Sequence, residues 1–214
     1  MPALTDLNGL AGAAVVIVAA LVAAGRAIGL RRSGLALVAG VGAVAALVPI
    51  GALPLAGLLR GVVGDLSLTT LVLLLVGLRR HLRAEEPVDN RSMFALQCLL
   101  AVGGLALYSL ALGLGTWDPY RLGYGDPWFL AALLAVALTA LAFDLPLVTF
   151  GLAVGVLAWA LETYESRNLW DYLLDPLVFA WAFSSLMLRG AGALVRGHGR
   201  ATETLLRMRA GSSS

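Results

Sequence analysis

The side chains that could do chemistry in this chain of 214 residues gather at three places. The first place is the entrance to an apolar stretch, and it holds Arg60, Asp65, Ser67, Thr69 and Thr70. The other two are connections that combine rings with single arginines and acids, and their candidates are Tyr120, Arg121, Tyr124, Glu162, Arg167, Trp170 and Asp171. Arginine can grip a phosphate or carboxylate through two parallel hydrogen bonds, and rings can stack on a sugar. These residue types predict a binding site for a ligand or a partner protein.

The pair Arg60 and Asp65 admits two interpretations. Charged side chains near hydrocarbon are costly unless they are paired or wet, and they are by default candidates for function. The same pair could instead be a structural ion pair that pins the connection of residues 49–64 onto the bundle, with the neighbouring hydroxyl groups bonding back to their own helix. The sequence leaves both interpretations open.

The composition decides which elements must position these residues. Apolar residues make up 60% of the chain and charged residues 13%, whereas a soluble domain is about half apolar and about a quarter charged. The chain carries too little charge to coat a water-facing globule, so we expect the lipid bilayer to be its main solvent. We therefore predict an all-α, multi-pass membrane helix bundle.

The residue inventory excludes several kinds of site. All fifteen basic residues are arginine, and without lysine there is no Schiff base to retinal or pyridoxal and no Walker phosphate loop. The single Cys98 excludes an intramolecular disulfide and a cysteine-rich metal site. His81 and His198 lie among arginines rather than in apolar runs, so they cannot clasp an intramembrane haem. We expect no cofactor, no metal site and, at a formal net charge of +2, no nucleic-acid partner.

Long uncharged stretches predict about seven membrane helices, at roughly 20 apolar residues for each crossing. The expected spans are residues 7–25, 33–48, 61–78, 92–115, 127–143, 145–161 and 176–195, and the third of them includes Asp65. Pro49 and Pro54 each remove a backbone donor, so residues 49–59 are expected to form a re-entrant or interfacial connection. Little more than Asp144 separates the fifth span from the sixth, which predicts a tight helical hairpin.

The arginines set the orientation, because positively charged loops are retained in the cytoplasm. Twelve arginines fall on one side of the predicted bundle: Arg26, Arg31, Arg32, Arg79, Arg80, Arg83, Arg91, Arg189, Arg196, Arg200, Arg207 and Arg209. Arg60, Arg121 and Arg167 fall on the other side. The chain should therefore start outside and end in the cytoplasm, with residues 1–195 as one domain and residues 196–214 as a short basic tail. The last four residues, 211–214, look like a cloning remnant.

The aromatic residues show a second asymmetry. No Phe, Trp or Tyr occurs before Phe94, and all five tryptophans fall at or near the expected outer ends of the last four spans. Amphipathic rings prefer the headgroup level, which explains a belt of rings but not its restriction to one side.

The connection of residues 162–175 is the densest polar segment of the chain. One helical face would be apolar and the other polar, with Leu169, Trp170, Leu173 and Leu174 opposed to Asn168, Asp171 and Asp175. This pattern predicts a short helix that lies in the headgroup plane at the outer interface.

Three Asp-Pro pairs begin at Asp118, Asp126 and Asp175. Aspartate accepts the free N–H groups of a first helical turn, and proline loses no bond at the first position, so Asp126 and Asp175 are predicted helix caps. The run Leu-Gly-Tyr-Gly-Asp at residues 122–126 resembles the GxGD signature of intramembrane aspartyl proteases and prepilin peptidases. That resemblance would require a second carboxylate at the same depth; the spans offer no clear partner for Asp126, and Pro127 favours the cap.

The preferred function is a non-catalytic subunit or accessory protein of the bacterial inner membrane. Its periplasmic face would dock a partner protein, a second copy of the chain, or an envelope lipid or glycan. A small-solute transporter or channel, with Arg60 and Asp65 lining a path, is one alternative. An outer-leaflet hydrolase or transferase is another, and it needs two carboxylates among Asp65, Asp118, Glu162 and Asp171 within about 5 Å or somewhat more.

Overall fold

The computed structural model describes residues 4–83 and 88–192, and this part of the chain is all-α apart from one very short hairpin. The α-helices are α1 (Leu4–Ala27), α2 (Arg32–Leu47), α3 (Leu55–Val63), α4 (Leu68–Arg83), α5 (Asn90–Ser109), α6 (Pro127–Ala142), α7 (Pro146–Ala160), α8 (Leu169–Leu173) and a final helix over residues 176–192. A π-helix, η1 (Leu110–Leu114), continues α5, and a 3₁₀-helix, η2 (Pro119–Tyr124), follows it. The predicted basic tail of residues 196–214, with its four arginines and the suspected cloning remnant, lies outside the described residues.

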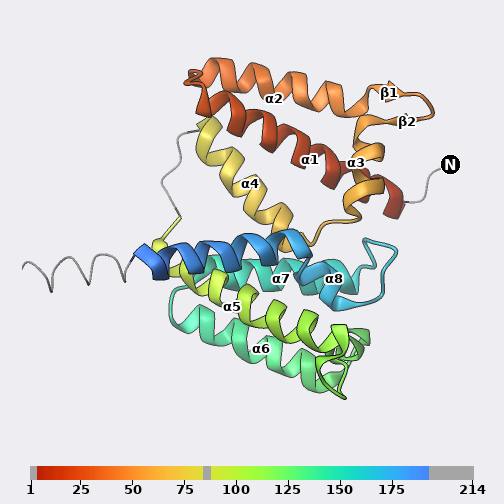
Figure 1. Cartoon of the computed structure of the whole chain (residues 1–214), viewed down its shortest axis with the longest axis vertical. Helices are drawn as coiled ribbons and strands as arrows, with labels where there is room; N and C mark the ends of the chain where they lie inside the picture. The colour runs from red at the N-terminus through yellow and green to blue at the C-terminus, as the bar shows by residue number, and fades with distance from the viewer. Residues whose placement is uncertain (1–3, 84–87, 193–214) are drawn as a thin grey trace, which may run out of the picture.

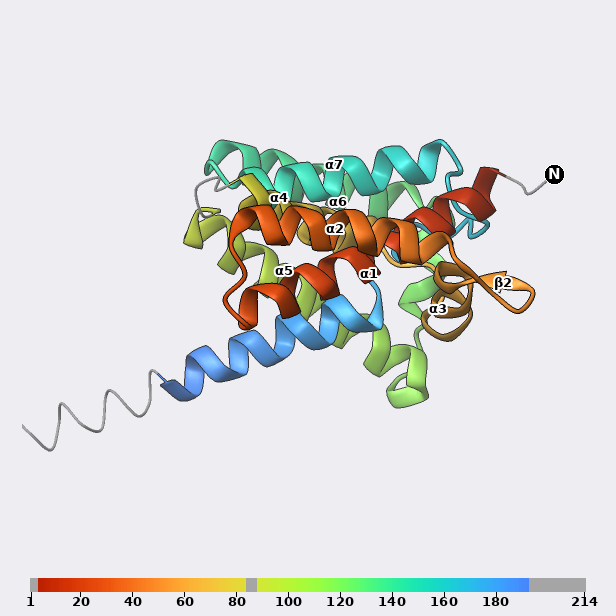
Figure 2. The same cartoon turned by 90° about the horizontal axis from the view of Figure 1, so that it is seen from above.

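The helices form two groups that run between the same two ends of the molecule (Figures 1 and 2). In the first group, α1 packs along α2 and contacts α3 and α4. In the second group, α7 packs against α5, α6 and α8, and the final helix lies beside them. Contacts of α4 with α7 and α8 join the two groups.

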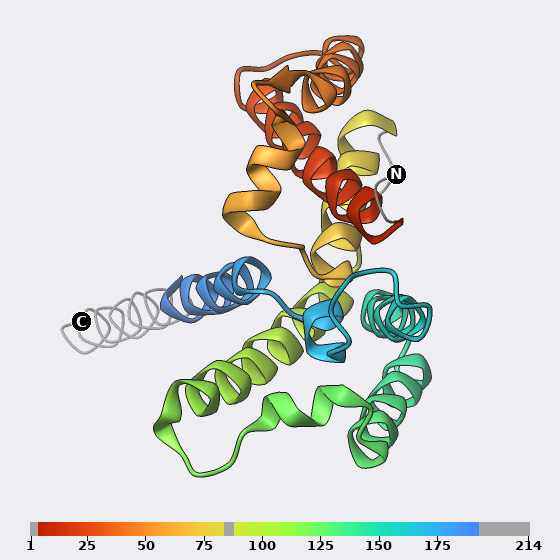
Figure 3. The same cartoon turned by 90° about the vertical axis from the view of Figure 1, so that its right-hand side faces the viewer.

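The two ends differ in their chemistry. One end, which we call the acid end, holds the start of α1, all of α3, the start of α4, η2, α8 and the start of the final helix, and Figure 3 looks onto it. The opposite end, which we call the arginine end, holds the α1–α2 turn, the last turn of α4, the first turn of α5 and the α6–α7 turn. Within the described residues, its arginines are Arg26, Arg31, Arg32, Arg79, Arg80, Arg83, Arg91 and Arg189. The alternation of arginine-rich connections in the sequence therefore corresponds to two ends of the bundle.

The larger apolar core is centred on α8. Leu169 and Tyr172 of this helix are fully buried, and side chains of α4, α5, α7 and the final helix surround them. The prediction of a short helix is confirmed, but the polar face that the pattern assigns to it is not exposed as expected. Because α8 is only five residues long, its neighbours cover both of its faces, and the supposedly outward Asn168 and Asp175 are buried too.

The helix ends follow the local signals of the sequence. Asp126 caps α6 by accepting hydrogen bonds from the backbone N–H groups of Trp128 and Phe129, and Asp89 caps α5 in the same way through Ser92. Asp144 adopts a left-handed φ of 53°, which turns the chain directly from α6 into α7. The predicted cap at Asp126 and the predicted tight hairpin are therefore confirmed.

The third predicted span begins too early. Residues 49–54 form the β1–β2 hairpin and residues 55–63 form α3. Gly64 then takes a φ of 79°, which is open to glycine and ends this helix. The next helix, α4, begins only at Leu68, so Asp65 lies in the link between two helices and not within a span.

The expectation of seven membrane helices is met only in part. Two helices are long and apolar enough to cross a bilayer, over Thr5–Ala27 and Asn90–Leu114. Three others, α2, α6 and α7, are apolar but have 15 or 16 residues. Sixteen residues rise about 24 Å, whereas the hydrocarbon core of a typical bilayer is about 30 Å thick.

Candidate functional site

The residues that the sequence analysis proposed for the site all lie at the acid end, but they form separate clusters. Arg60 and Asp65 meet each other, and Tyr120 meets Asp171. Trp170 donates from its indole Nε1 to the carbonyl oxygen of Pro119. Among the described residues, the side chains of Arg121, Glu162 and Arg167 take no part in a hydrogen bond or ion pair, and all three are exposed.

Arg60 is the centre of the first cluster. Its Nε donates to Asp65 Oδ1 at 2.6 Å and its second terminal nitrogen donates to Asp65 Oδ2 at 3.0 Å, so the pair is bidentate. The remaining terminal nitrogen reaches Asp6 Oδ1 of α1 at 3.1 Å, and Glu165 Oε1 lies 3.8 Å from the guanidinium. The hydrogen bond with Asp65, more than any other contact, raises the pKa of Arg60. Arg60 therefore stays charged and ties α1 to α3 and to the link before α4.

A glycine of α1 makes room for this ion pair. A Cβ atom at Gly9 would lie 2.3 Å from both Arg60 Nε and Asp65 Oδ1, which is far inside contact distance. The neighbouring Asn8 donates from Nδ2 to the carbonyl oxygen of Thr163 at 2.9 Å. The first turns of α1 are thus fitted against charged and polar groups of three later segments.

Asp175 is the most heavily bonded carboxylate of the acid end, and it is only 6% exposed. One oxygen, Oδ1, caps the final helix by accepting from the N–H groups of Leu177 and Val178, both at 2.8 Å. The other oxygen, Oδ2, accepts from the N–H and hydroxyl groups of Ser67 at 2.9 and 2.7 Å and from the hydroxyl of Thr70. The predicted cap is confirmed, and the same side chain also joins the final helix to the start of α4.

Tyr120 and Asp171 form the third cluster. The tyrosine hydroxyl donates to Asp171 Oδ2 at 2.9 Å, and the Ser166 hydroxyl donates to the same oxygen at 2.5 Å. Burial first, and then the hydrogen bond to Asp171, raise the pKa of Tyr120. The fully buried Asn168 fixes the neighbouring backbone by donating from Nδ2 to the carbonyl oxygen of Tyr120 at 2.8 Å.

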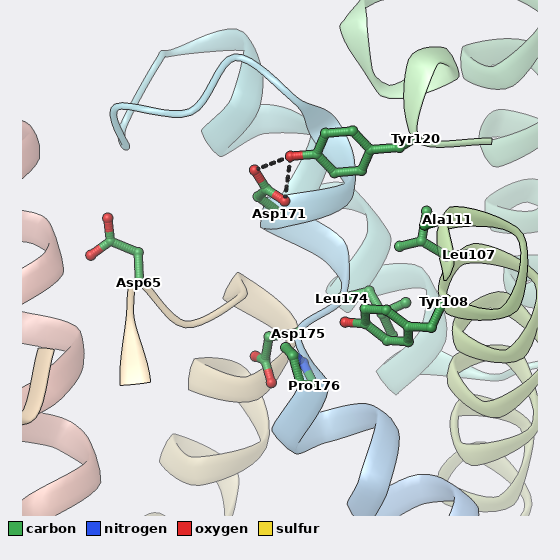
Figure 4. A pocket seen from close by; sticks show the side chains of 9 residues that line it. All are labelled: Asp65, Leu107, Tyr108, Ala111, Tyr120, Asp171, Leu174, Asp175 and Pro176. Carbon is green, nitrogen blue, oxygen red and sulfur yellow. Dashed lines mark hydrogen bonds between the residues drawn. The ribbon is translucent and has the colours of Figure 1, made fainter. Parts of the chain in front are cut away.

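A cavity of about 350 Å³ opens between these clusters. Its lining comes from the link after α3, from α5 and η1, from η2, and from α8 and the start of the final helix: Asp65, Leu107, Tyr108, Ala111, Tyr120, Asp171, Leu174, Asp175 and Pro176. In Figure 4, Tyr120 and Asp171 lie at one side of this cavity, Asp175 and Pro176 at another, and Tyr108 faces them from α5. We call it the tyrosine–aspartate cavity.

A second hollow lies beside η2. Its volume is about 370 Å³, and Thr116, Trp117, Asp118, Arg121, Leu122 and Asp126 line it. Three rings close by are strongly exposed: Trp117 at 56%, Tyr124 at 63% and Trp128 at 82%. We call Trp117, Arg121, Tyr124 and Trp128 the aromatic rim.

Three carboxylates of the acid end are already engaged by neighbouring groups. Asp65 is held by Arg60, Asp171 by two hydroxyl groups and Asp175 by five donors, so each carboxylate has a structural task. Asp126 is a helix cap next to Pro127, as the alternative to the GxGD resemblance predicts. In the part of the chain that the structure describes, no three His, Cys, Asp or Glu side chains are placed to hold a metal ion.

Several residues of the site were missed by reasoning from the sequence. Asp6, Glu165 and Tyr108 carried no local signal, because each is brought to the site from a distant segment. Asn168 was noticed, but it was expected on an exposed polar face, whereas it is fully buried and caps α8. Only the second role of Asp175 could have been found from the sequence. A helix cap uses one carboxylate oxygen, so the other oxygen needs further hydrogen-bond donors.

Comparisons with known proteins add no relative to this description. No family model, no curated protein and no solved structure matches the chain.

Proposed function

We propose that the chain is a multi-pass protein of the bacterial inner membrane, with the acid end on the periplasmic side and the arginine end in the cytoplasm. The support is the outer surface of the helices. On α2 alone, Leu37, Val41, Val44 and Leu47 are each 58–73% exposed. Monomeric soluble proteins rarely expose continuous apolar patches of this kind, whereas lipid-facing helices do.

The short helices are compatible with this proposal if the bilayer adapts to them. A hydrophobic segment shorter than the hydrocarbon thickness can be matched by local thinning, by snorkelling of flanking residues or by association with other helices. Trp128 lies in the first turn of α6 and Phe143 follows the helix, and both rings are exposed where they would reach the two headgroup regions. The proposal keeps seven crossings, of which those of α2, α4, α6 and α7 have 15 or 16 residues and are shorter than a typical span.

We further propose a non-catalytic role as a subunit or accessory protein that docks a partner protein or an envelope lipid or glycan at the acid end. The observation that carries this role is the aromatic rim. Its rings and its arginine are exposed, while the neighbouring carboxylates are already hydrogen-bonded. Aromatic residues and arginine contribute most of the binding energy in protein interfaces. Transport and carboxylate-dependent hydrolysis are less well supported, because Arg60 and Asp65 are locked in one ion pair.

Site-specific photo-crosslinking tests the docking role. Tyr124 and Phe143 are matched positions: both are aromatic, they are 63% and 61% exposed, and one precedes α6 while the other follows it. Each is replaced in turn by p-benzoyl-phenylalanine in the full chain, and native membranes are irradiated. We expect one discrete adduct from position 124 that Arg121→Ala weakens, and no such adduct from position 143.

Two results would contradict the docking role. One is the same pattern of adducts from both positions, which would indicate general contact with lipid. The other is a change in solute flux when the chain is deleted, together with no discrete adduct from position 124, which would favour the transporter alternative.

A further inference from the structure

The tyrosine–aspartate cavity has a charge that the protein itself does not balance. At the border of the cavity, Arg60 neutralises Asp65. Asp171 and Asp175 accept hydrogen bonds from neutral hydroxyl and N–H groups only. Hydrogen bonds stabilise a carboxylate, but they leave its negative charge in a partly desolvated place.

The walls of the cavity suit a small cation with an apolar attachment. The rings of Tyr108 and Tyr120 line it, and the face of an aromatic ring attracts a cation. Leu107, Ala111 and Leu174 supply apolar surface beside the rings. A volume of about 350 Å³ is at the lower end of the range of small-molecule sites.

Two polar groups in the cavity have unused hydrogen-bonding capacity. The hydroxyl of Tyr108 has no hydrogen-bond partner among the described residues, although its ring is fixed against Phe179 at 5.3 Å between centroids. Asp171 Oδ1 accepts one hydrogen bond, from Tyr120 at 3.1 Å, and a carboxylate oxygen can accept about two. Both groups can accept a hydrogen bond from a ligand that enters the cavity.

We propose that the tyrosine–aspartate cavity binds a primary ammonium group, held by Asp171 and by the hydroxyl and ring of Tyr108. The shared chemistry is that of an ethanolamine headgroup and of a free small amine. An ammonium ion supplies the positive charge that Asp171 lacks, and it donates hydrogen bonds that Asp171 Oδ1 and the Tyr108 hydroxyl can still accept. This inference deepens the proposed function, because it names a ligand chemistry for the end that docks.

Calorimetric titration of the full chain in detergent tests the inference. The titrants are a short-chain phosphatidylethanolamine, free ethanolamine, choline and a short-chain phosphatidylglycerol. We expect the two primary ammonium compounds to bind, choline to bind more weakly because it donates no hydrogen bond, and the glycerol lipid not to bind at this site. Binding of the lipid alone would identify a membrane lipid as the source, and equal binding of free ethanolamine would identify a soluble amine.

Three variants locate the site. Asp171→Asn is expected to weaken ethanolamine-headgroup binding about tenfold or more, because the amide keeps the shape but not the charge. Tyr108→Phe removes a hydroxyl that no described residue uses, so the fold should persist while affinity falls several-fold. Asp144→Asn makes the same change of charge at the arginine end, and it should leave binding unaltered.

The inference is overturned if the glycerol lipid binds as well as the ethanolamine lipid, or if Asp171→Asn and Tyr108→Phe bind like the wild type. Either result would leave the docking role intact, because the aromatic rim does not line this cavity. Conversely, loss of the rim adduct with ammonium binding preserved would reject docking and keep the cavity site.

Discussion

The two ends of the molecule use charge in different ways. At the acid end, Arg60 bonds to two acids within 3.1 Å, and Asp175 receives five hydrogen bonds while almost completely buried. At the arginine end, Arg80 and Arg83 are exposed and form no ion pair within the described residues, and Arg189 only approaches the ring of Phe94 at 5.9 Å. The charged groups of the acid end hold its segments together, whereas the arginines of the other end are exposed to their surroundings.

This difference teaches that the number of charges does not indicate their structural importance. Removing a partner from a buried, fully bonded group leaves unsatisfied donors, which is costly. Removing an exposed charge mainly changes its interaction with water, ions or headgroups. Substitutions at the acid end should therefore affect folding, and those at the arginine end should affect orientation in the membrane.

The largest effect is expected from Asp175→Ala. Ser67, Thr70, Leu177 and Val178 would lose their acceptor in a buried place, so we expect a loss of about 3–5 kcal/mol in the free energy of unfolding. Chemical unfolding of the detergent-solubilised chain measures it. The matched control is Asp126→Ala, a more exposed cap that should cost about 1 kcal/mol. Equal losses in the two variants would show that Asp175 is no more than a cap.

A second substitution tests the packing of α1 on the ion pair. Gly9→Ala places a methyl group where Arg60 and Asp65 meet, so the pair must separate, and a loss of about 1–3 kcal/mol is expected. Gly12→Ala is the control one turn later, where the new Cβ meets Leu71 at an ordinary 3.5 Å. Since alanine favours helix, this control should be neutral or stabilising by up to about 1 kcal/mol. Thermal unfolding measures the stability of both variants. If Gly9→Ala lost no more stability than Gly12→Ala, α1 would not be packed on the ion pair.

A third prediction concerns alkaline pH. Burial is the main cause of the raised pKa values of Tyr120, Tyr164 and Tyr172, so the folded chain keeps these protons to higher pH than the unfolded chain. Their contribution to stability is complete below about pH 10 and falls as the pH rises above it, because the unfolded tyrosines ionise first. Stability measured from pH 7 to pH 11 should fall less steeply above pH 10 in Tyr120→Phe than in the wild type. Identical slopes would mean that the pKa of Tyr120 is not raised in the folded chain.

The smallest change of stability is expected at the arginine end. The double variant Arg80→Gln, Arg83→Gln should alter the free energy of unfolding by no more than about 0.5 kcal/mol, because both side chains are exposed. A loss similar to that of Asp175→Ala would remove the distinction between the two ends.

Much of the architecture could be predicted from the sequence because local rules govern it. Asp126-Pro127 and Asp175-Pro176 mark helix starts, Asp144 marks a turn, and the spacing of arginines divides the two ends. These signals act within a few residues, so neighbouring sequence is sufficient to interpret them.

The parts of the fold and of the site that could not be predicted depend on contacts between distant segments. The bond from Ser67 to Asp175 spans 108 residues, and that from Arg60 to Asp6 spans 54. The burial of α8 depends on α4, α7 and η2 closing around it, which its amphipathic pattern does not show. The start of α4 was misplaced because the apolar run continues through Gly61 and Val62, while Gly64 ends the helix before it.

Accessibility labelling tests the central proposal most directly, namely that the acid end faces the periplasm. Cys98 is replaced by serine, and a single cysteine is introduced by Thr116→Cys at the acid end or by Asp144→Cys at the arginine end, both exposed positions. A membrane-impermeant maleimide is applied to right-side-out membrane vesicles. We predict that position 116 reacts at once and that position 144 reacts only after the membrane is permeabilised; the reverse order, or equal labelling of both positions in sealed vesicles, would contradict the proposed orientation.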